Sequence, residues 1–119
     1  MALNELLGKY KGKYQLKALP PYLLIQVRRF TKNQFFEEKN NTIVNFPLRN
    51  LDLSELLGAP ASYDLLANVV HEGKPDSGTY RAQVRHGEEW YDIQDLHVNK
   101  LLPQQVTVSE CYLLLFERH

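Results

Sequence analysis

The sequence predicts an α+β domain, with an antiparallel-rich sheet of about six strands and one or two short helices. Apolar runs rich in β-branched and aromatic residues alternate with turns rich in Gly, Pro and Asp, which is typical of strands joined by hairpins. A final uninterrupted apolar run, Cys111–Glu117, is typical of a central strand buried on both faces. A chain of 119 residues with 44% hydrophobic residues suits one domain with its own core.

The first part of the chain combines a helix, a strand and a polar connection. Apolar side chains recur at helical spacing over residues 3–10, which predicts a short amphipathic helix. Two prolines, at 20 and 21, then exclude helix, and the apolar run Tyr22–Phe30 predicts a buried strand. The polar stretch Thr31–Asn41 is expected to form a loop or an irregular hairpin.

The middle of the chain mixes short elements with one long strand. Thr42–Phe46 is expected to form a short strand that Pro47 stops. Leu51–Gly58 is expected to form one or two helical turns, closed by its last glycine. The apolar run Ser62–Val70 predicts a long strand, and the loop Gly73–Gly78 follows it.

The last third of the chain predicts a hairpin followed by the final strand. Thr79–Arg85 alternates with period two, as half-buried strands do. A tight turn follows, in which Gly87 supplies the positive φ, and Glu89–Ile93 returns antiparallel. Val98–Pro103 is expected to be irregular before the final strand begins.

Charge is balanced overall but not along the chain. Lys and Arg together number 14, as do Asp and Glu, so the net charge gives no reason to expect nucleic-acid or membrane binding. Residues 1–32 nevertheless carry a balance of +6, which residues 33–119 offset. This asymmetry marks either a contact surface or an ordinary solvated basic face beside a helix. It leaves open whether RNA contacts these first residues.

A single cysteine, Cys111, excludes an internal disulfide and a cysteine-rich zinc site, and it fits a reducing cytosolic or nuclear compartment. The first residues are too weakly apolar for a signal peptide, and no stretch approaches the roughly 20 apolar residues of a membrane span. We therefore expect a soluble intracellular protein without membrane contact.

Several motifs occur in a fixed order between Leu19 and Arg118. In order they are Leu19–Phe30 (LPPYLLIQVRRF), Lys39–Leu53, Tyr63–Arg81 with its triplet Gly78-Thr79-Tyr80, Trp90–Val98, and the closing Tyr112–Arg118. The set resembles the C-terminal part of the catalytic domain of ubiquitin-specific proteases. The resemblance implies the palm part of a papain-like cysteine peptidase fold. Residues 1–119 are accordingly expected to form a single partial domain, with a short basic helix and lead-in over 1–18 and a palm-like sheet over 19–119.

The same resemblance implies that the catalytic chemistry has been lost. Active members place a catalytic histidine in the Gly-His-Tyr triplet, where this chain has Thr79. A threonine hydroxyl has no useful basicity near neutral pH and cannot accept a thiol proton. Gln94 stands in the place of the orienting Asp or Asn, with Asp95 after it. The family's cysteine box and its zinc-binding Cys pairs have no match in this sequence. The resemblance implies a pseudoenzyme with no metal and no cofactor.

Four residues around this position are provisional binding candidates: Gly78, Tyr80, Trp90 and Tyr91. For the three aromatic residues, cross-strand packing is the simpler role. His71 is expected to be structural rather than a displaced base, while His86 and His97 are expected at the surface. Four acidic residues form a hairpin patch that is either solvated or a contact for a basic protein: Glu88, Glu89, Asp92 and Asp95.

Within the family, the substitutions resemble the inactive splicing branch that the spliceosomal tri-snRNP carries. This resemblance implies a protein-interaction scaffold in pre-mRNA splicing, located in the nucleus, with tri-snRNP proteins as partners. A second hypothesis is a residual ubiquitin-binding module without hydrolase activity. A third is half of a deubiquitinating enzyme, and it is the weakest because a partner chain cannot supply the base that Thr79 replaces.

Overall fold

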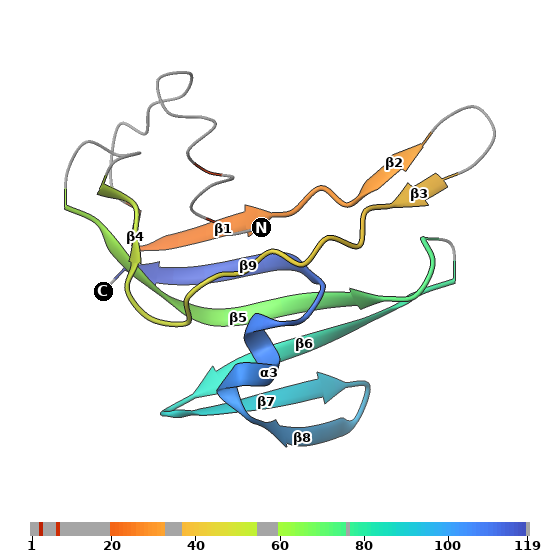
Figure 1. Cartoon of the computed structure of the whole chain (residues 1–119). Helices are drawn as coiled ribbons and strands as arrows, with labels where there is room; N and C mark the ends of the chain where they lie inside the picture. Colours follow the sequence, from red (N-terminus) through yellow and green to blue (C-terminus); the bar gives the residue numbers. More distant parts are fainter. Residues whose placement is uncertain are drawn as a thin grey trace.

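The computed structural model describes Leu3 and Leu7 together with residues 20–32, 37–54, 60–75 and 77–118. Within these ranges the chain forms a large antiparallel sheet, a small hairpin and one short helix (Figure 1). The strands are β1 (Tyr22–Gln26), β2 (Phe30–Lys32), β3 (Glu37–Lys39), β4 (Leu51–Asp52), β5 (Ser62–Glu72), β6 (Thr79–His86), β7 (Glu89–Gln94), β8 (His97–Leu101) and β9 (Cys111–Arg118), and the helix is α3 (Pro103–Thr107). No helix of this described part is long and apolar enough to cross a membrane.

The large sheet has seven strands in the order β1-β9-β5-β6-β7-β8, with β4 also paired to β5. Its pairs are all antiparallel. The expected α+β class with an antiparallel sheet of about six strands is therefore confirmed. The last strand of the sequence lies between β1 and β5, as its continuous apolar run indicates.

The hairpins follow from their turn residues. The β6–β7 turn contains Gly87 at φ 65°, which confirms the expected positive φ. The β7–β8 turn contains Asp95 at φ 54°, a conformation that Asp tolerates better than most side chains. The expected irregular hairpin within Thr31–Asn41 is present as β2 and β3.

The core lies on the face of the sheet that α3 and residues 42–53 cover (Figure 1). Leu114 and Phe116 of β9 and Leu65 of β5 are fully buried there. Burying each such side chain contributes about 1.5–3 kcal/mol. The covering layer supplies Val44, Phe46, Leu51, Leu53 and Val106. Leu3 and Leu7, which are helical, also pack against this core, while the rest of the helix expected over residues 3–10 lies outside the described residues.

Two expected strands of the first half differ in the structure. The run Tyr22–Phe30 is divided between β1 and β2, and β1 is an edge strand of the described sheet with Tyr22 and Leu24 exposed. Only alternate side chains of β1 face the core, because one face of the sheet is left uncovered there. Thr42–Phe46 is extended but carries only an isolated bridge at Asn45. It buries apolar side chains by lying across the sheet instead of joining it.

Two further segments also depart from expectation. Leu51 and Asp52 form β4, not the start of a helix, and the chain is helical only from Ser54, beyond which residues 55–59 are outside the described part. Val98–Pro103 is not irregular, because β8 occupies most of it and α3 begins at Pro103. Proline suits the first position of a helix, where its missing N–H has no partner to lose.

Candidate functional site

Thr79 and Gln94, which stand at the positions that the family resemblance assigns to the catalytic pair, lie at one end of the sheet. Thr79 is the first residue of β6, is exposed, and pairs with Glu72 of β5. Gln94 is the last residue of β7 and Asp95 begins the turn after it. Because Ala82 pairs with Ile93, the start of β6 and the end of β7 lie at the same end. The sheet therefore keeps the positions together, without an imidazole at residue 79.

His97 is the cross-strand partner of Gln94. Its side chain is exposed on the β7–β8 hairpin, as expected for a surface histidine. The thiol of Cys111 lies on β9, which is separated from β7 by β5 and β6. His97 is therefore separated from the Cys111 thiol by several strands of the described sheet.

His71 is a buried packing residue. It is only 1% exposed, and its ring lies edge-on between Phe30 and Tyr80, with centroids 4.9 Å from each. Burial lowers the pKa of His71, and the nearby Lys39 cation lowers it further. The imidazole is therefore neutral near pH 7 and shielded from solvent, which supports the expected structural role.

Gly78 has a packing role of its own. A Cβ built on Gly78 would lie 2.2 Å from Nε2 of His71 and 2.6 Å from the carbonyl oxygen of Glu72. Any side chain at this position would therefore push against both a ring and a backbone. This close approach accounts for glycine in the Gly-Thr-Tyr triplet without a ligand.

The candidate aromatic residues have different surroundings. Tyr80 makes an edge-to-face contact with His71, its direct partner across the β5–β6 pair, but remains 54% exposed, and its ring centroid lies 5.8 Å from that of Tyr112. Trp90 is only 3% exposed and belongs to the core, which leaves no ring surface for a ligand. The Tyr91 hydroxyl donates to Glu89 Oε2 at 2.7 Å. Tyr80 alone of these three presents a large open aromatic face.

Cys111 is fully buried, as its sequence context predicts. Burial raises the pKa of the Cys111 thiol, and the Arg29 guanidinium, 3.7 Å from the sulfur, only partly opposes this shift. A buried thiol with a raised pKa is a poor nucleophile.

Arg29 belongs to the interior and not to a basic surface. Its Nε donates to the Cys111 carbonyl at 2.6 Å, and its Nη1 donates to the carbonyls of Asn40 and Thr42 at 3.0 and 2.6 Å. One buried guanidinium therefore ties the covering segment to β9, using the planar donor geometry of arginine. The net charge of +6 counted over residues 1–32 therefore includes at least one cation, Arg29, that is not at the surface.

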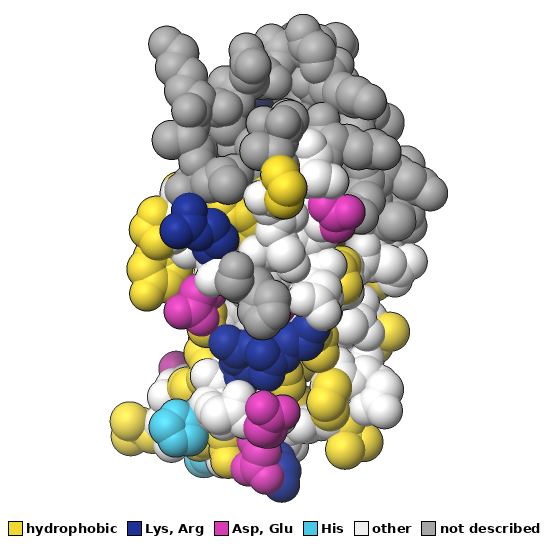
Figure 2. All heavy atoms as spheres, turned by 90° about the vertical axis from the view of Figure 1, so that its left-hand side faces the viewer, with side chains coloured by type: hydrophobic (Ala, Val, Ile, Leu, Met, Phe, Trp, Pro, Cys, Tyr) yellow, Lys and Arg dark blue, Asp and Glu magenta, His cyan; other side chains and the backbone are white. Residues whose placement is uncertain are grey.

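The acidic hairpin patch is largely neutralised by ion pairs. Glu89 lies 2.8 Å from Lys100, and Glu88 lies 3.8 Å from Arg49. Asp92 is buried and lies 2.9 Å from Arg81. Figure 2 shows basic and acidic side chains next to one another on this side of the molecule. No cluster of His, Cys, Asp or Glu in the described residues could hold a metal ion.

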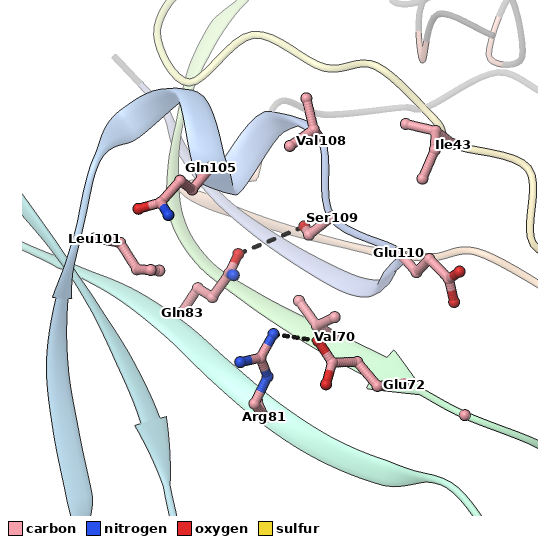
Figure 3. A pocket seen from close by; sticks show the side chains of 11 residues that line it. Ile43, Val70, Glu72, Arg81, Gln83, Leu101, Gln105, Val108, Ser109 and Glu110 are labelled. Atoms are coloured by element: carbon pink, nitrogen blue, oxygen red, sulfur yellow. Dashed lines mark hydrogen bonds and ion pairs between the residues drawn. The ribbon is translucent and has the colours of Figure 1, made fainter.

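A groove of about 410 Å³ lies beneath the chain that leads from β8 through α3 to β9 (Figure 3). Its floor carries Arg81 and Gln83 of β6, and Arg81 forms an ion pair with Glu72. Neither Thr79 nor any residue of β7 lines it. No sequence pattern indicates this groove, because its lining comes from four separated segments.

Solved structures define the class of fold. The chain superposes with a TM-score of 0.88 on the SAGA Ubp8/Sgf11/Sus1/Sgf73 DUB module, at 23% identity, covering 99% of this chain and 30% of the other. The same kind of module bound to monoubiquitin gives a TM-score of 0.85 at 20% identity, covering 99% and 33%. The fold is thus that of a ubiquitin-specific protease catalytic domain.

Sequence comparisons assign the chain to a family. The family model for ubiquitin carboxyl-terminal hydrolase matches residues 8–116. "Ubiquitin carboxyl-terminal hydrolase 39" of Homo sapiens is 50% identical over 115 residues, which cover 89% of this chain and 20% of that protein. "Probable mRNA-splicing protein ubp10" of Schizosaccharomyces pombe is 32% identical, covering 98% and 28%. The chain belongs to the ubiquitin carboxyl-terminal hydrolase family, and it spans between a fifth and a third of the length of these curated relatives.

Proposed function

We propose that this chain is a catalytically inactive ubiquitin-specific protease-like domain that serves as a protein-interaction scaffold in pre-mRNA splicing. The observation that carries the inactive part is Thr79, which stands at the start of β6 beside the end of β7 without an imidazole. The splicing part is supported by the similarity to the Schizosaccharomyces pombe protein named "Probable mRNA-splicing protein ubp10". The partners would be tri-snRNP proteins, and the location would be the nucleus.

Inactivity is tested with ubiquitin substrates. The full chain is incubated at high concentration with a fluorogenic ubiquitin substrate and with a ubiquitin vinyl-sulfone probe. We expect neither turnover nor labelling, because the described thiol is buried and no general base accompanies it. Labelling that exceeds that of a Cys111→Ser control would show a reactive thiol and refute the proposal.

The scaffold role is tested by affinity capture. The immobilised full chain is incubated with nuclear extract, and the bound proteins are quantified by mass spectrometry against beads carrying an unrelated domain of similar size. We expect enrichment of tri-snRNP proteins. If none is enriched, the proposed place in splicing is lost, whereas the catalytic test is unaffected.

A residual ubiquitin-binding module remains a second candidate, favoured by the exposed ring of Tyr80. This ring extends the cluster formed with Phe30, His71 and Tyr112, next to the end of the sheet where Thr79 lies. Titration of isotope-labelled ubiquitin with the chain tests this candidate. Shifts that weaken in Tyr80→Ala would support it, and the absence of shifts at millimolar concentration would remove it.

A further inference from the structure

The groove beneath α3 combines apolar walls with polar groups at the floor and rim. Ile43, Leu101 and Val108 supply apolar side chains, and Gln83 lies centrally on the floor (Figure 3). Glu72 and Glu110 lie toward one end of the groove in this view, and Leu101 and Gln105 lie toward the other. Its volume of about 410 Å³ falls within the range of about 300–1,000 Å³ that is usual for ligand pockets.

Two side-chain amides have donors to spare. Gln83 is 3% exposed, and its Oε1 accepts a hydrogen bond from Asn68 Nδ2 at 2.9 Å. Gln105 uses its Oε1 to accept from the backbone N–H of Leu102 at 2.9 Å. Within the described residues, the Nε2 groups of both glutamines remain free to donate. A ligand that satisfies them must offer acceptors such as peptide carbonyls.

The charge of the groove favours a cationic guest. Glu72 contacts Arg81 through Oε1, and Glu110 contacts the buried Lys39 through Oε2, so each carboxylate keeps its second oxygen for another partner. The lining itself holds two carboxylates, Glu72 and Glu110, against one cation, Arg81, while Lys39 and Asp92 stand outside the lining and offset each other. The excess of one negative charge disfavours phosphate and carboxylate ligands.

We propose that this groove binds a peptide segment that carries a lysine or an arginine. Backbone carbonyls of the peptide accept from the amides of Gln83 and Gln105, and the basic side chain reaches the carboxylates of Glu72 and Glu110. Apolar neighbours in the peptide pack on the aliphatic walls. This inference is independent of the splicing role and of ubiquitin binding, since Thr79 and Tyr80 do not line the groove.

A titration with defined peptides tests the proposal. The full chain, labelled with nitrogen-15, is titrated with the capped tripeptide acetyl-Val-Lys-Val-amide and, as the matched control, with acetyl-Val-Glu-Val-amide. We expect the lysine peptide to shift the side-chain amide resonances of Gln83 and Gln105 and to bind at least about fivefold more tightly than the control. Equal affinities, or unmoved glutamine resonances at saturating peptide, would overturn the proposal.

A pair of exposed substitutions locates the binding. Val108 is 63% exposed at the groove, whereas Leu96 is 97% exposed in the β7–β8 turn and does not line it. Val108→Lys places a cation at the rim and is expected to weaken binding of the lysine peptide at least about fivefold. Leu96→Lys adds the same charge elsewhere and is expected to leave the affinity unchanged. If the two variants bind the peptide equally well, the groove is not the site.

Discussion

Gly78 shows how one missing side chain shapes the end of the sheet. Gly78→Ala is expected to destabilise the fold by about 1–3 kcal/mol, because the new Cβ would press on His71 and on the Glu72 carbonyl. The measurement is the free energy of unfolding in urea. Gly87→Ala is the control, since a Cβ there meets no atom within 4 Å and its φ of 65° alone costs about 1 kcal/mol. A smaller loss at Gly78 than at Gly87 would contradict the packing argument.

Arg29 carries the second prediction at this scale. Arg29→Lys is expected to cost about 3 kcal/mol of unfolding free energy, because a single ammonium cannot occupy both the Nε position, which donates to Cys111, and the Nη1 position, which donates to Asn40 and Thr42. Arg28→Lys, at an exposed position, is the matched control and is expected to change stability by no more than about 0.5 kcal/mol. Chemical denaturation of both variants measures the difference. Equal losses of unfolding free energy would show that the hydrogen bonds of Arg29 do not stabilise the contact between residues 40–42 and β9.

The buried ring of His71 predicts a pH dependence. Its pKa is lowered in the folded state, mainly by burial, so between the folded pKa and the ordinary value near 6.5 the unfolded chain binds more protons. Stability should therefore fall as the pH is lowered below about 6.5. The measurement is the unfolding free energy from pH 7.5 to 5. Its decrease toward low pH should be smaller in His71→Phe than in the unmodified chain and unchanged in His97→Gln. If His71→Phe shows the same dependence of unfolding free energy on pH as the unmodified chain, His71 is not its source.

At the scale of elements, the prediction from sequence succeeds where a strand is buried and fails where it is not. The runs that became β5, β6, β7 and β9 show apolar length or alternation that only a sheet explains. The sequence does not predict β8, because four of its five residues are exposed and the segment shows no alternating pattern. Thr42–Phe46 has the apolar pattern of a strand without pairing as one, because Val44 and Phe46 are buried against the core and not by a neighbouring strand.

The sequence likewise predicts only part of the candidate site. That Thr79 and Gln94 lie at one end of the sheet could be predicted, because a tight β6–β7 hairpin fixes the register between them. The burial of the Arg29 side chain could not be predicted. Two consecutive arginines do not indicate which of the two side chains binds the carbonyls of a segment distant in sequence. The groove beneath α3 was equally hidden, because a five-residue helix leaves almost no periodic signal.

Ser109 links these elements through a buried polar network. Its hydroxyl donates to the Val106 carbonyl at 2.7 Å and accepts from Asn68 Nδ2 at 2.9 Å, which joins the end of α3 to β5. Ser109→Ala is expected to cost about 1–2 kcal/mol, because the partners lose a hydrogen bond inside a poorly solvated site. Urea denaturation checks this value. Thr107→Ala, which loses a hydroxyl with an exposed bond to Gln104, is the control and should cost less.

At the scale of the whole molecule, the described chain has the fold of part of a ubiquitin-specific protease domain, and Thr79 and Gln94 stand on strands that are not neighbours of the strand of Cys111. A base at residue 79 would stand on β6, and an orienting side chain on β7. The described thiol stands on β9, which is two strands from β6. Strands lie about 4.8 Å apart, so Cys111 is roughly 10 Å across the sheet from Arg81, and it faces the core.

Introducing a histidine at residue 79 should therefore not produce hydrolysis. In Thr79→His the imidazole would lie near Gln94 but would have no thiol to deprotonate, since Cys111 is buried and burial raises the pKa of its thiol. Cleavage of a fluorogenic ubiquitin substrate by this variant is expected to equal that of Thr79→Val. Turnover in Thr79→His that disappears in the double variant with Cys111→Ser would show that the sheet can bring these two groups together, contrary to the arrangement described.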